Sequence, residues 1–495
     1  MRKITGLIAI LLTVWFGIGC AASTAVGKKG KEVGPDGVAK VSAETRADFE
    51  VAVKKYQAAR KAGTAVQDCK DLADEFEEVS SDAEGFAPAL FNRAVILDDC
   101  DMEKEAQKAF RDVLKVDPKH QLSITYLATY DHGKGNINDA LRQYKKAIKV
   151  QPNALEAVPA YVNLAAIERE QGEYKKSQTN LRRALAIDSS YLPAFFHLAM
   201  LYYDIAIKEE RKSFFQLAEL VCSQAIQLEG GANYAPIYNV WGMIKLKKDE
   251  IVAAANKFKQ AFEHDSEFFE AYMNFGSITL NFRGFEDAQM AFSKALELNP
   301  DSYEAHIGLG VALRGLQQFD EAKKHYAAAK KLDSQRSDVY FNEGVLEMDY
   351  VGTGDEKSYK KAIKIFEKFL DHVSERERQD PDGKKGPDVS WEEKAKKRIE
   401  TCKKNINMLR EAEEAMREME KLKKEMEERR KREEEEKKKV LAEAKKLEEG
   451  GTPPAEGEAA KKDEDKEKEE SKKEEAAKKE DDKSKEADKS DKKDK

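Results

Sequence analysis

The sequence predicts an all-α protein, a superhelical solenoid of helical hairpins followed by a long charged helix and a disordered tail. Three observations lead to this fold class. A pattern of small and aromatic residues returns at intervals of 34 residues through the middle of the chain, which is typical of a repeat protein. Apolar residues at alternating spacings of four and three begin near Trp391 and predict a helix. Residues 449–495 are rich in Lys and Glu and cannot bury a core, so we expect them to be disordered.

The composition argues against several classes of function. Of 495 residues, 37% are charged, and the formal net charge is −7, whereas a nucleic-acid-binding protein is usually basic. Five cysteines are too few for a disulfide scaffold, and none lies in a metal-binding spacing. The sequence contains no glycine-rich phosphate-binding loop and no nucleophile motif. We therefore expect no enzyme activity, cofactor, metal, nucleic acid or small-molecule substrate.

The first 19 residues have the character of an export signal. Two basic residues precede an apolar run from Ile4 to Ile18, which is too short to span a membrane comfortably. The run closes on the sequence FGIGC, which resembles the lipobox of bacterial lipoproteins, although Gly17 stands where that motif usually has Leu. The resemblance implies a signal peptide over residues 1–19 and lipidation of Cys20. An uncleaved anchor and cleavage beyond Cys20 are the alternatives.

The residues that follow Cys20 bear on the location of the protein. In lipoproteins of this type, an Asp after the cysteine usually signals retention in the inner membrane, so Ala21 implies the outer membrane. Residues 20–42 are rich in Gly, Ala and Lys and are predicted to be a flexible tether. We expect a lipid-anchored protein that faces the periplasm.

Residues 43–371 are predicted to form the solenoid, with eight clear hairpins over 87–371 and one helical hairpin before them. Each first helix has an aromatic residue or Leu and, four positions later, a small residue. Each second helix has Ala, an aromatic residue four positions later and, usually, Ala three positions after that. The copy that best shows the pattern contains Tyr272, Gly276, Ala288, Phe292, Ala295 and Pro300. Gly or Ala allows helices to approach closely, the rings fill the space between hairpins, and Pro ends the second helix.

This pattern resembles the tetratricopeptide repeat (TPR), over more than half of the chain. The resemblance implies hairpins that stack only on their neighbours and form a superhelix with a concave face, which usually binds protein. Two insertions depart from the regular spacing, at Lys208 to Phe214 and at Val351 to Ser358. Recognition loops and longer helices are both open explanations for them.

The TPR resemblance also implies which side chains line the concave face. Two positions per repeat are Phe91 and Val95, Thr125 and Thr129, Val162 and Ala166, Phe196 and Met200, Asn239 and Met243, Met273 and Ser277, Ile307 and Val311, and Phe341 and Val345. Because most of them are apolar, we expect a groove that takes an amphipathic helix or an extended apolar segment of a partner protein. The alternative is that some of these side chains pack inside a tight superhelix.

Four repeats carry Asn at one equivalent position, namely Asn92, Asn163, Asn274 and Asn342. An Asn amide both donates and accepts hydrogen bonds and so matches the backbone of an extended peptide. The arrangement resembles the asparagine ladder of the O-linked N-acetylglucosamine transferase superhelix. The alternative is that these residues stabilise the hairpins.

The cysteines beyond Cys20 are dispersed. Cys69 is expected on a helix before the first clear repeat and Cys100 at the turn of the next hairpin. Since these helices should be neighbours, a Cys69–Cys100 disulfide is sterically feasible in an oxidising periplasm. Two unpaired buried thiols are the alternative.

The composition changes after the solenoid. Residues 372–389, which include DGKKGPD, are predicted to be a linker. In the helix predicted over 390–448, an apolar stripe from Trp391 is suited to capping the last hairpin. The stripe thins towards Met426, and the sequence EERRKREEEEKKK that follows can be stabilised by ion pairs within one helix. A single solvent-exposed helix and a coiled-coil dimer through Met426 are both open.

The overall layout resembles the TPR lipoproteins of the myxobacterial gliding-motility (Agl–Glt) envelope complex. That resemblance implies an outer-membrane-anchored scaffold or adaptor, which binds protein partners in a trans-envelope machine for gliding motility. A pilotin-like assembly factor for a secretin and an activator of a cell-wall enzyme are the alternatives.

Overall fold

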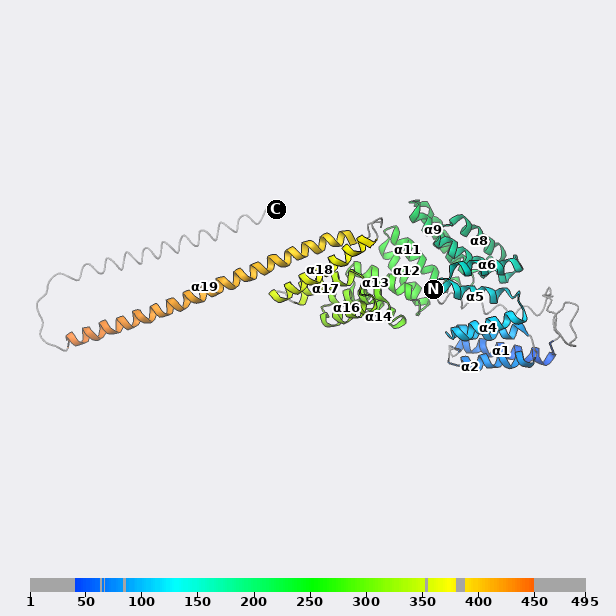
Figure 1. Ribbon diagram of the computed structural model, residues 1–495, viewed down its shortest axis with the longest axis horizontal. Helices are drawn as coiled ribbons and strands as arrows, with labels where there is room; N and C mark the ends of the chain where they lie inside the picture. The colour runs from blue at the N-terminus through cyan, green and yellow to red at the C-terminus, as the bar shows by residue number, and fades with distance from the viewer. Residues whose placement is uncertain are drawn as a thin grey trace. The chain divides into compact units, whose positions relative to one another are not determined.

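The computed structural model describes residues 41–62, 65, 67–82, 86–351, 355–379 and 388–448 (Figure 1). The regular elements in these ranges are all helices, and they form a solenoid of paired helices followed by one long helix. The predicted fold class is therefore confirmed for its solenoid and its long helix. The signal peptide, Cys20, nearly all of the tether and the tail predicted over 449–495 lie outside the described residues.

The helices follow one another in pairs, and each pair forms a hairpin (Figure 1). The pair before the repeats is α1 (Ala43–Ala62) and α2 (Cys69–Asp82). The first helices of the repeats are α3 (Ala87–Asp99), α5 (Gln121–Gly133), α7 (Val158–Glu170), α9 (Leu192–Lys208), α11 (Ala235–Lys247), α13 (Phe269–Asn281), α15 (Tyr303–Gly315) and α17 (Asp338–Leu346). The second helices are α4 (Glu103–Val116), α6 (Ile137–Val150), α8 (Tyr174–Ile187), α10 (Ser213–Ala225), α12 (Ile251–His264), α14 (Phe285–Leu298), α16 (Phe319–Leu332) and α18 (Glu356–Gln379).

In several hairpins, a small residue on the first helix packs against an aromatic ring on the second helix. In α15, a Cβ atom added to Gly310 would lie 2.4 Å from the ring of Tyr326, which is fully buried on α16. The same contact recurs between Gly242 and Phe258, where the distance would be 2.6 Å. Since side-chain atoms do not approach this closely, the repeated glycines are required for close helix packing. The spacing in the sequence thus reflects the contact that sets the hairpin geometry.

The two insertions take different forms. Helix α9 has 17 residues where α7 and α11 have 13 each, so part of the first insertion lengthens the helix. In the last hairpin, a π-helical turn over Glu347–Val351 follows α17, and residues 352–354 lie outside the described ranges.

The predicted boundary between solenoid and linker at residue 371 is wrong. Helix α18 continues to Gln379, and Val373 is buried. The physical reason is that no Pro or Gly interrupts the chain before Pro381, so the helix extends into residues predicted as linker.

Helix α19 (Asp388–Glu448) is 61 residues long, or about 90 Å at 1.5 Å per residue. Its residues up to Lys403 belong to the same compact unit as the solenoid, and those from Lys404 belong to a second unit. In the first part, Ala395 and Cys402 are buried. In the second part, acidic and basic side chains four residues apart form ion pairs, which stabilise a solvated helix; they include Glu413–Arg417, Glu420–Lys424, Glu427–Lys431 and Arg429–Glu433. None of the described helices has both the length and the apolar composition required to cross a bilayer.

Candidate protein-binding face

The first helices of successive hairpins share one side of the solenoid, which we call the first-helix face. It carries the sixteen predicted groove positions, two on each of the eight first helices from α3 to α17. The structure divides these positions into a closed N-terminal part, an open middle part and a covered C-terminal part.

The N-terminal part of the first-helix face is closed. Phe91 is only 1% exposed, and its ring lies 4.9–6.0 Å from the rings of Phe110, His120 and Tyr126. Other buried members of this part are Val95, Thr125, Val162 and Ala166. The prediction that Phe91, Val95 and Val162 line a groove is therefore wrong, because they form the core between adjacent hairpins.

The C-terminal end of the face is covered by the start of α19. Phe341 is 9% exposed, and its ring centroid lies 4.6 Å from that of Trp391 and 5.4 Å from that of Phe369. Val345 is buried as well. Arg398 donates a hydrogen bond of 2.7 Å to Asp349 beside them. The capping segment of α19 thus occupies this end, and Phe341 is not available to a partner.

The middle part of the face carries half-buried apolar side chains, which we call the open row. Its members come from α9, α11, α13 and α15, and they are Phe196, Met200, Met243, Met273, Ile307 and Val311. Each packs with one side against a buried cluster and remains partly exposed on the other. Three of the six are Met, whose flexible thioether chain adapts to irregular apolar surfaces. The open row is the part of the predicted groove that can contact a partner.

Three of the four repeated asparagines are hydrogen-bonded within the solenoid. Asn163 donates to the hydroxyl of Thr129 at 3.3 Å, and Asn274 donates to the side-chain oxygen of Asn239 at 2.9 Å. Asn342 is buried and donates to the carbonyl of Asp338 at 3.0 Å. These contacts link neighbouring first helices or turns of one helix, as expected of Asn that stabilises hairpins. Asn92, by contrast, makes no side-chain hydrogen bond to another described residue.

Asn239, which was predicted to line the groove, is also buried. Its side chain accepts the hydrogen bond from Asn274, so it faces its neighbour and not a free surface. The asparagines therefore contribute to the spacing of α11 and α13.

A row of charged side chains near the ends of the first helices was not predicted. Tyr130 on α5 donates a hydrogen bond to Asp98 on α3. His132 lies 3.8 Å from Glu170 on α7, and Arg169 pairs with Asp204 on α9. These contacts join four successive first helices, and we call them the polar ladder. A signal was present in the sequence, because the charged residues follow the predicted groove positions by three or four residues.

Burial shifts the pKa values of groups in and near the polar ladder. It raises the pKa of the carboxyl groups of Asp98 and Asp99. Burial, together with the nearby positive charge of Arg169, lowers the pKa of His197 to about 3. The Nδ1 atom of His197 is buried with no hydrogen-bond partner among the described residues. His197 is therefore neutral at physiological pH.

The structure joins Cys69, at the start of α2, to Cys100, directly after α3, in a disulfide with the Cα atoms 6.3 Å apart. This separation lies in the usual range for disulfides. Cys222 and Cys402 are buried free thiols, and burial raises the pKa of Cys222 to about 12 and that of Cys402 to about 11, so neither is a reactive thiolate.

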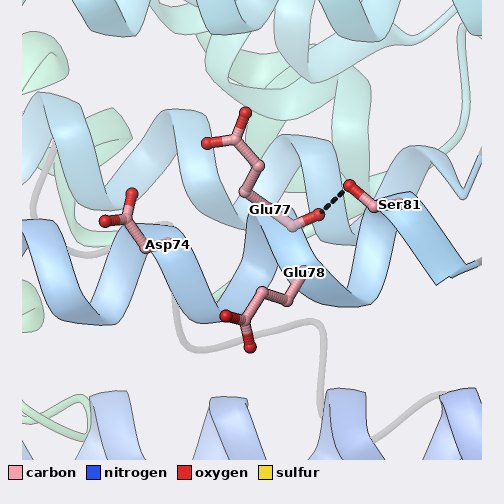
Figure 2. Close-up of a pocket in the computed structure, with 4 residues that line it drawn as sticks. All are labelled: Asp74, Glu77, Glu78 and Ser81. Carbon is pink, nitrogen blue, oxygen red and sulfur yellow. Dashed lines mark hydrogen bonds between the residues drawn. The ribbon is translucent and has the colours of Figure 1, made fainter.

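A shallow depression on α2 is lined by Asp74, Glu77, Glu78 and Ser81 (Figure 2). Ser81 donates a hydrogen bond of 2.9 Å to the backbone carbonyl of Glu77. The carboxylates point away from one another in this view. Within the described ranges, no group of three or more His, Cys, Asp or Glu side chains is arranged to hold a metal ion.

The profile of the tetratricopeptide repeat matches residues 87–120, 158–191 and 285–340. The chain carries tetratricopeptide repeats. The first two matched ranges coincide with the hairpins α3–α4 and α7–α8. TPR domains generally mediate protein–protein interactions as scaffolds.

One curated relative is a Hordeum vulgare protein named as a probable UDP-N-acetylglucosamine–peptide N-acetylglucosaminyltransferase, SPINDLY. It is 26% identical over 131 residues, which cover 24% of this chain and 14% of that protein. The chain therefore spans only a small part of the relative's length.

Solved TPR structures resemble parts of the chain. TTC0263, a thermophilic TPR protein of Thermus thermophilus, is 21% identical and matches 39% of this chain and 99% of its own, with a TM-score of 0.35. YrrB, described as a TPR protein with an unusual peptide-binding site, is 20% identical over 40% of this chain and 97% of its own, with a TM-score of 0.30. The pilF protein of Pseudomonas aeruginosa is 19% identical and matches 46% of this chain and 94% of its own, with a TM-score of 0.36.

Proposed function

We propose that this protein is a scaffold that holds a segment of a partner protein on the open row of its first-helix face. The observation that carries the proposal is the partial exposure of six apolar side chains on four successive first helices. Exposed apolar surface with this regular spacing suits the apolar side of a helix or an extended segment. Because Asn163 and Asn274 are hydrogen-bonded within the solenoid, we expect apolar contacts, and not an asparagine ladder, to supply the binding energy.

The test replaces apolar side chains of the open row with charge. Phe196→Glu with Met200→Glu, and separately Ile307→Glu with Val311→Glu, should each abolish capture of the partner in cells treated with a crosslinker. The reason is that a carboxylate cannot be buried against an apolar partner without a large desolvation cost. Far-UV circular dichroism and the melting temperature should stay close to the wild-type values.

A matched control uses the second helix of the same hairpin. Leu217 and Leu220 on α10 are 42% and 54% exposed, and Leu217→Glu with Leu220→Glu adds the same charge away from the first-helix face. This control should retain the partner. Equal losses in both variants, or unfolding of the Phe196/Met200 variant, would remove the open row from the mechanism.

The location we propose is the periplasmic side of the outer membrane, through a lipid on Cys20. The support is the short apolar run that closes on GIGC and the Ala21 that follows. Cys20→Ala should leave an unprocessed protein without acyl chain. Uptake of labelled palmitate by this variant, together with its recovery in the outer-membrane fraction, would disprove the proposal.

The cellular role we propose is an adaptor in a trans-envelope machine of the gliding-motility type. It is supported by the combination of an export signal, an array of TPR hairpins and a Lys/Glu-rich tail. Identification of the crosslinked partner tests this role directly. Recovery of a secretin as the principal partner would favour the pilotin alternative, and recovery of a cell-wall enzyme would favour the activator alternative.

A further inference from the structure

Residues 408–426 of α19 carry an exposed apolar stripe. The side chains of Met408, Met416, Met419, Leu422 and Met426 are between 58% and 71% exposed. With Leu409, Ala412 and Ala415 they recur at spacings of three and four, so they share one face of the helix. The stripe is about 28 Å long at 1.5 Å per residue. A face of this length and apolar content is characteristic of a helix that pairs with another helix.

Glutamates flank the stripe on both sides. In heptad positions a to g, the stripe occupies a (Leu409, Met416), d (Ala412, Met419, Met426) and g (Met408, Ala415, Leu422). At 100° per residue, position e borders the stripe on one side and position c on the other. Position e holds Glu413, Glu420 and Glu427, and position c holds Glu411, Glu418 and Glu425. The apolar face is therefore enclosed by two columns of acidic side chains.

The two columns differ in their ion pairs. Glu413, Glu420 and Glu427 lie 3.3–3.7 Å from basic side chains four residues later in α19. Glu411, Glu418 and Glu425 form no ion pair with any residue that the structure describes. This unpaired column lies directly beside apolar side chains that a partner helix would cover. Its charge is thus available to a basic side chain on that partner.

A second copy of α19 does not complement this face. In a parallel pair, equivalent a positions meet, so Lys423 would face Lys423 of the other copy, and the glutamates at e would face the apolar residues at g. In an antiparallel pair, positions e face each other, so glutamates would face glutamates. Neither orientation of a self-pair provides the glutamates at position c with a column of basic partners, because Lys423 is the only basic residue within the stripe, and each orientation brings like charges together.

We propose that residues 408–426 of α19 form a docking face for a helix of another protein whose apolar stripe is bordered by Lys or Arg. The basic side chains of such a helix would pair with Glu411, Glu418 and Glu425, and its apolar side chains would cover the methionines. The surface is separate from the open row, so the protein would hold two different partner segments. Charge selects this partner, while burial of the stripe supplies the binding energy.

Two synthetic amphipathic helices of about four heptads test the proposal on the full-length protein. Both have Leu at positions a and d; one has Lys at e and g, and the other has Glu there. Neither synthetic helix pairs readily with a second copy of itself, because the like charges at its positions e and g repel each other. Fluorescence anisotropy at low ionic strength should show binding of the Lys probe and at least about tenfold weaker binding of the Glu probe, since several ion pairs separate the two. Added salt should reduce the difference.

Charge reversal on the helix supplies the decisive variants. Glu411→Lys with Glu418→Lys and Glu425→Lys should reverse the preference between the two probes. The matched control is Glu414→Lys with Glu428→Lys and Glu435→Lys, which changes the net charge equally at position f, on the opposite side of the helix. The control should keep the preference for the Lys probe. Helical circular dichroism should be unchanged in both, because Glu and Lys have similar helix propensities.

Replacing apolar side chains with Glu shows whether the probe binds to residues 408–426 or to the open row. Met416→Glu with Met419→Glu should abolish binding of the Lys probe, while Phe196→Glu with Met200→Glu should leave it unchanged. The proposal is overturned if the glutamate-to-lysine variants at positions c and f show the same preference between the two probes. It is also overturned if the Phe196/Met200 variant no longer binds the Lys probe. It is also overturned if sedimentation shows a wild-type dimer that Met419→Glu dissociates, because a second copy would then be the occupant.

Discussion

At the scale of single residues, the hairpins depend on the absence of a Cβ atom at defined places. In a helix interior, Ala is normally more stable than Gly by up to about 1 kcal/mol. We expect the opposite at Gly310, because a methyl group would lie 2.4 Å from the buried Tyr326 ring. Gly310→Ala should lower the free energy of unfolding by about 1–3 kcal/mol in urea titration. Gly133→Ala is the control, since nothing lies within 4 Å of that position, and it should be neutral or stabilising. Equal effects of the two substitutions would contradict the contact.

A second residue-scale prediction concerns His197, which lies near the polar ladder. Its pKa is lowered to about 3 in the folded protein, whereas in the unfolded chain it is near 6.5. Between these pH values the unfolded state binds more protons than the folded state. The stabilising contribution of neutral His197 is therefore fully present above about pH 6.5 and decreases as the pH falls. The contribution is about 1.4 kcal/mol per pH unit. His120, with a pKa lowered to about 4 by burial, adds to it.

The measurement is the urea midpoint at pH 7 and pH 5.5. The decrease in the urea midpoint from pH 7 to pH 5.5 should be smaller in His197→Leu than in the wild-type protein. His264→Gln, at an exposed position, should show the wild-type decrease. The window stays above pH 5 because the raised pKa values of Asp98 and Asp99 add stability when those carboxyl groups take up protons. An unchanged slope in the His197 variant would show that its imidazole does not govern the acid response.

At the scale of elements, the disulfide joins α2 to α3 across 31 residues of chain. A cross-link of this length stabilises mainly by restricting the unfolded chain, typically by about 2–4 kcal/mol. Cys69→Ser with Cys100→Ser should therefore lower the stability of the N-terminal hairpins. A reductant should have the same effect on the wild-type protein and none on the double variant. A melting curve of the wild-type protein that does not respond to the reductant would argue against a disulfide in solution.

At the scale of the whole molecule, stability should spread through contacts between neighbouring hairpins. Ala288 is fully buried on α14, and Ala288→Leu should overpack this contact at a cost of about 1–3 kcal/mol. Hydrogen exchange should become faster in α13 to α16 and remain unchanged in α3 to α6. Ala327→Leu adds the same volume at an exposed position on α16 and should leave exchange as it is. Uniform acceleration along the chain would indicate that the solenoid unfolds as one unit.

The all-α class, the paired helices and the small-to-aromatic contacts of the hairpins could be predicted from the amino-acid sequence. This was possible because each of these depends on residues within one repeat or in adjacent repeats, and the spacing of 34 residues records them directly. The stripe and the ion pairs of α19 were predictable for the same reason, since residues three and four positions apart in one helix are neighbours.

Which of the predicted groove positions are open could be learned only from the packing of the helices. Phe91, Phe196 and Phe341 occupy the same position in their repeats, yet Phe196 alone remains half-exposed. Phe91 is enclosed by rings from the next hairpin, and Phe341 is covered by Trp391, 50 residues later in the chain. Likewise, Asn163 and Asn274 bond to neighbouring helices. The physical reason is that exposure depends on how closely successive hairpins stack and on what packs over the last one, and neither quantity is encoded in the pattern of a single repeat.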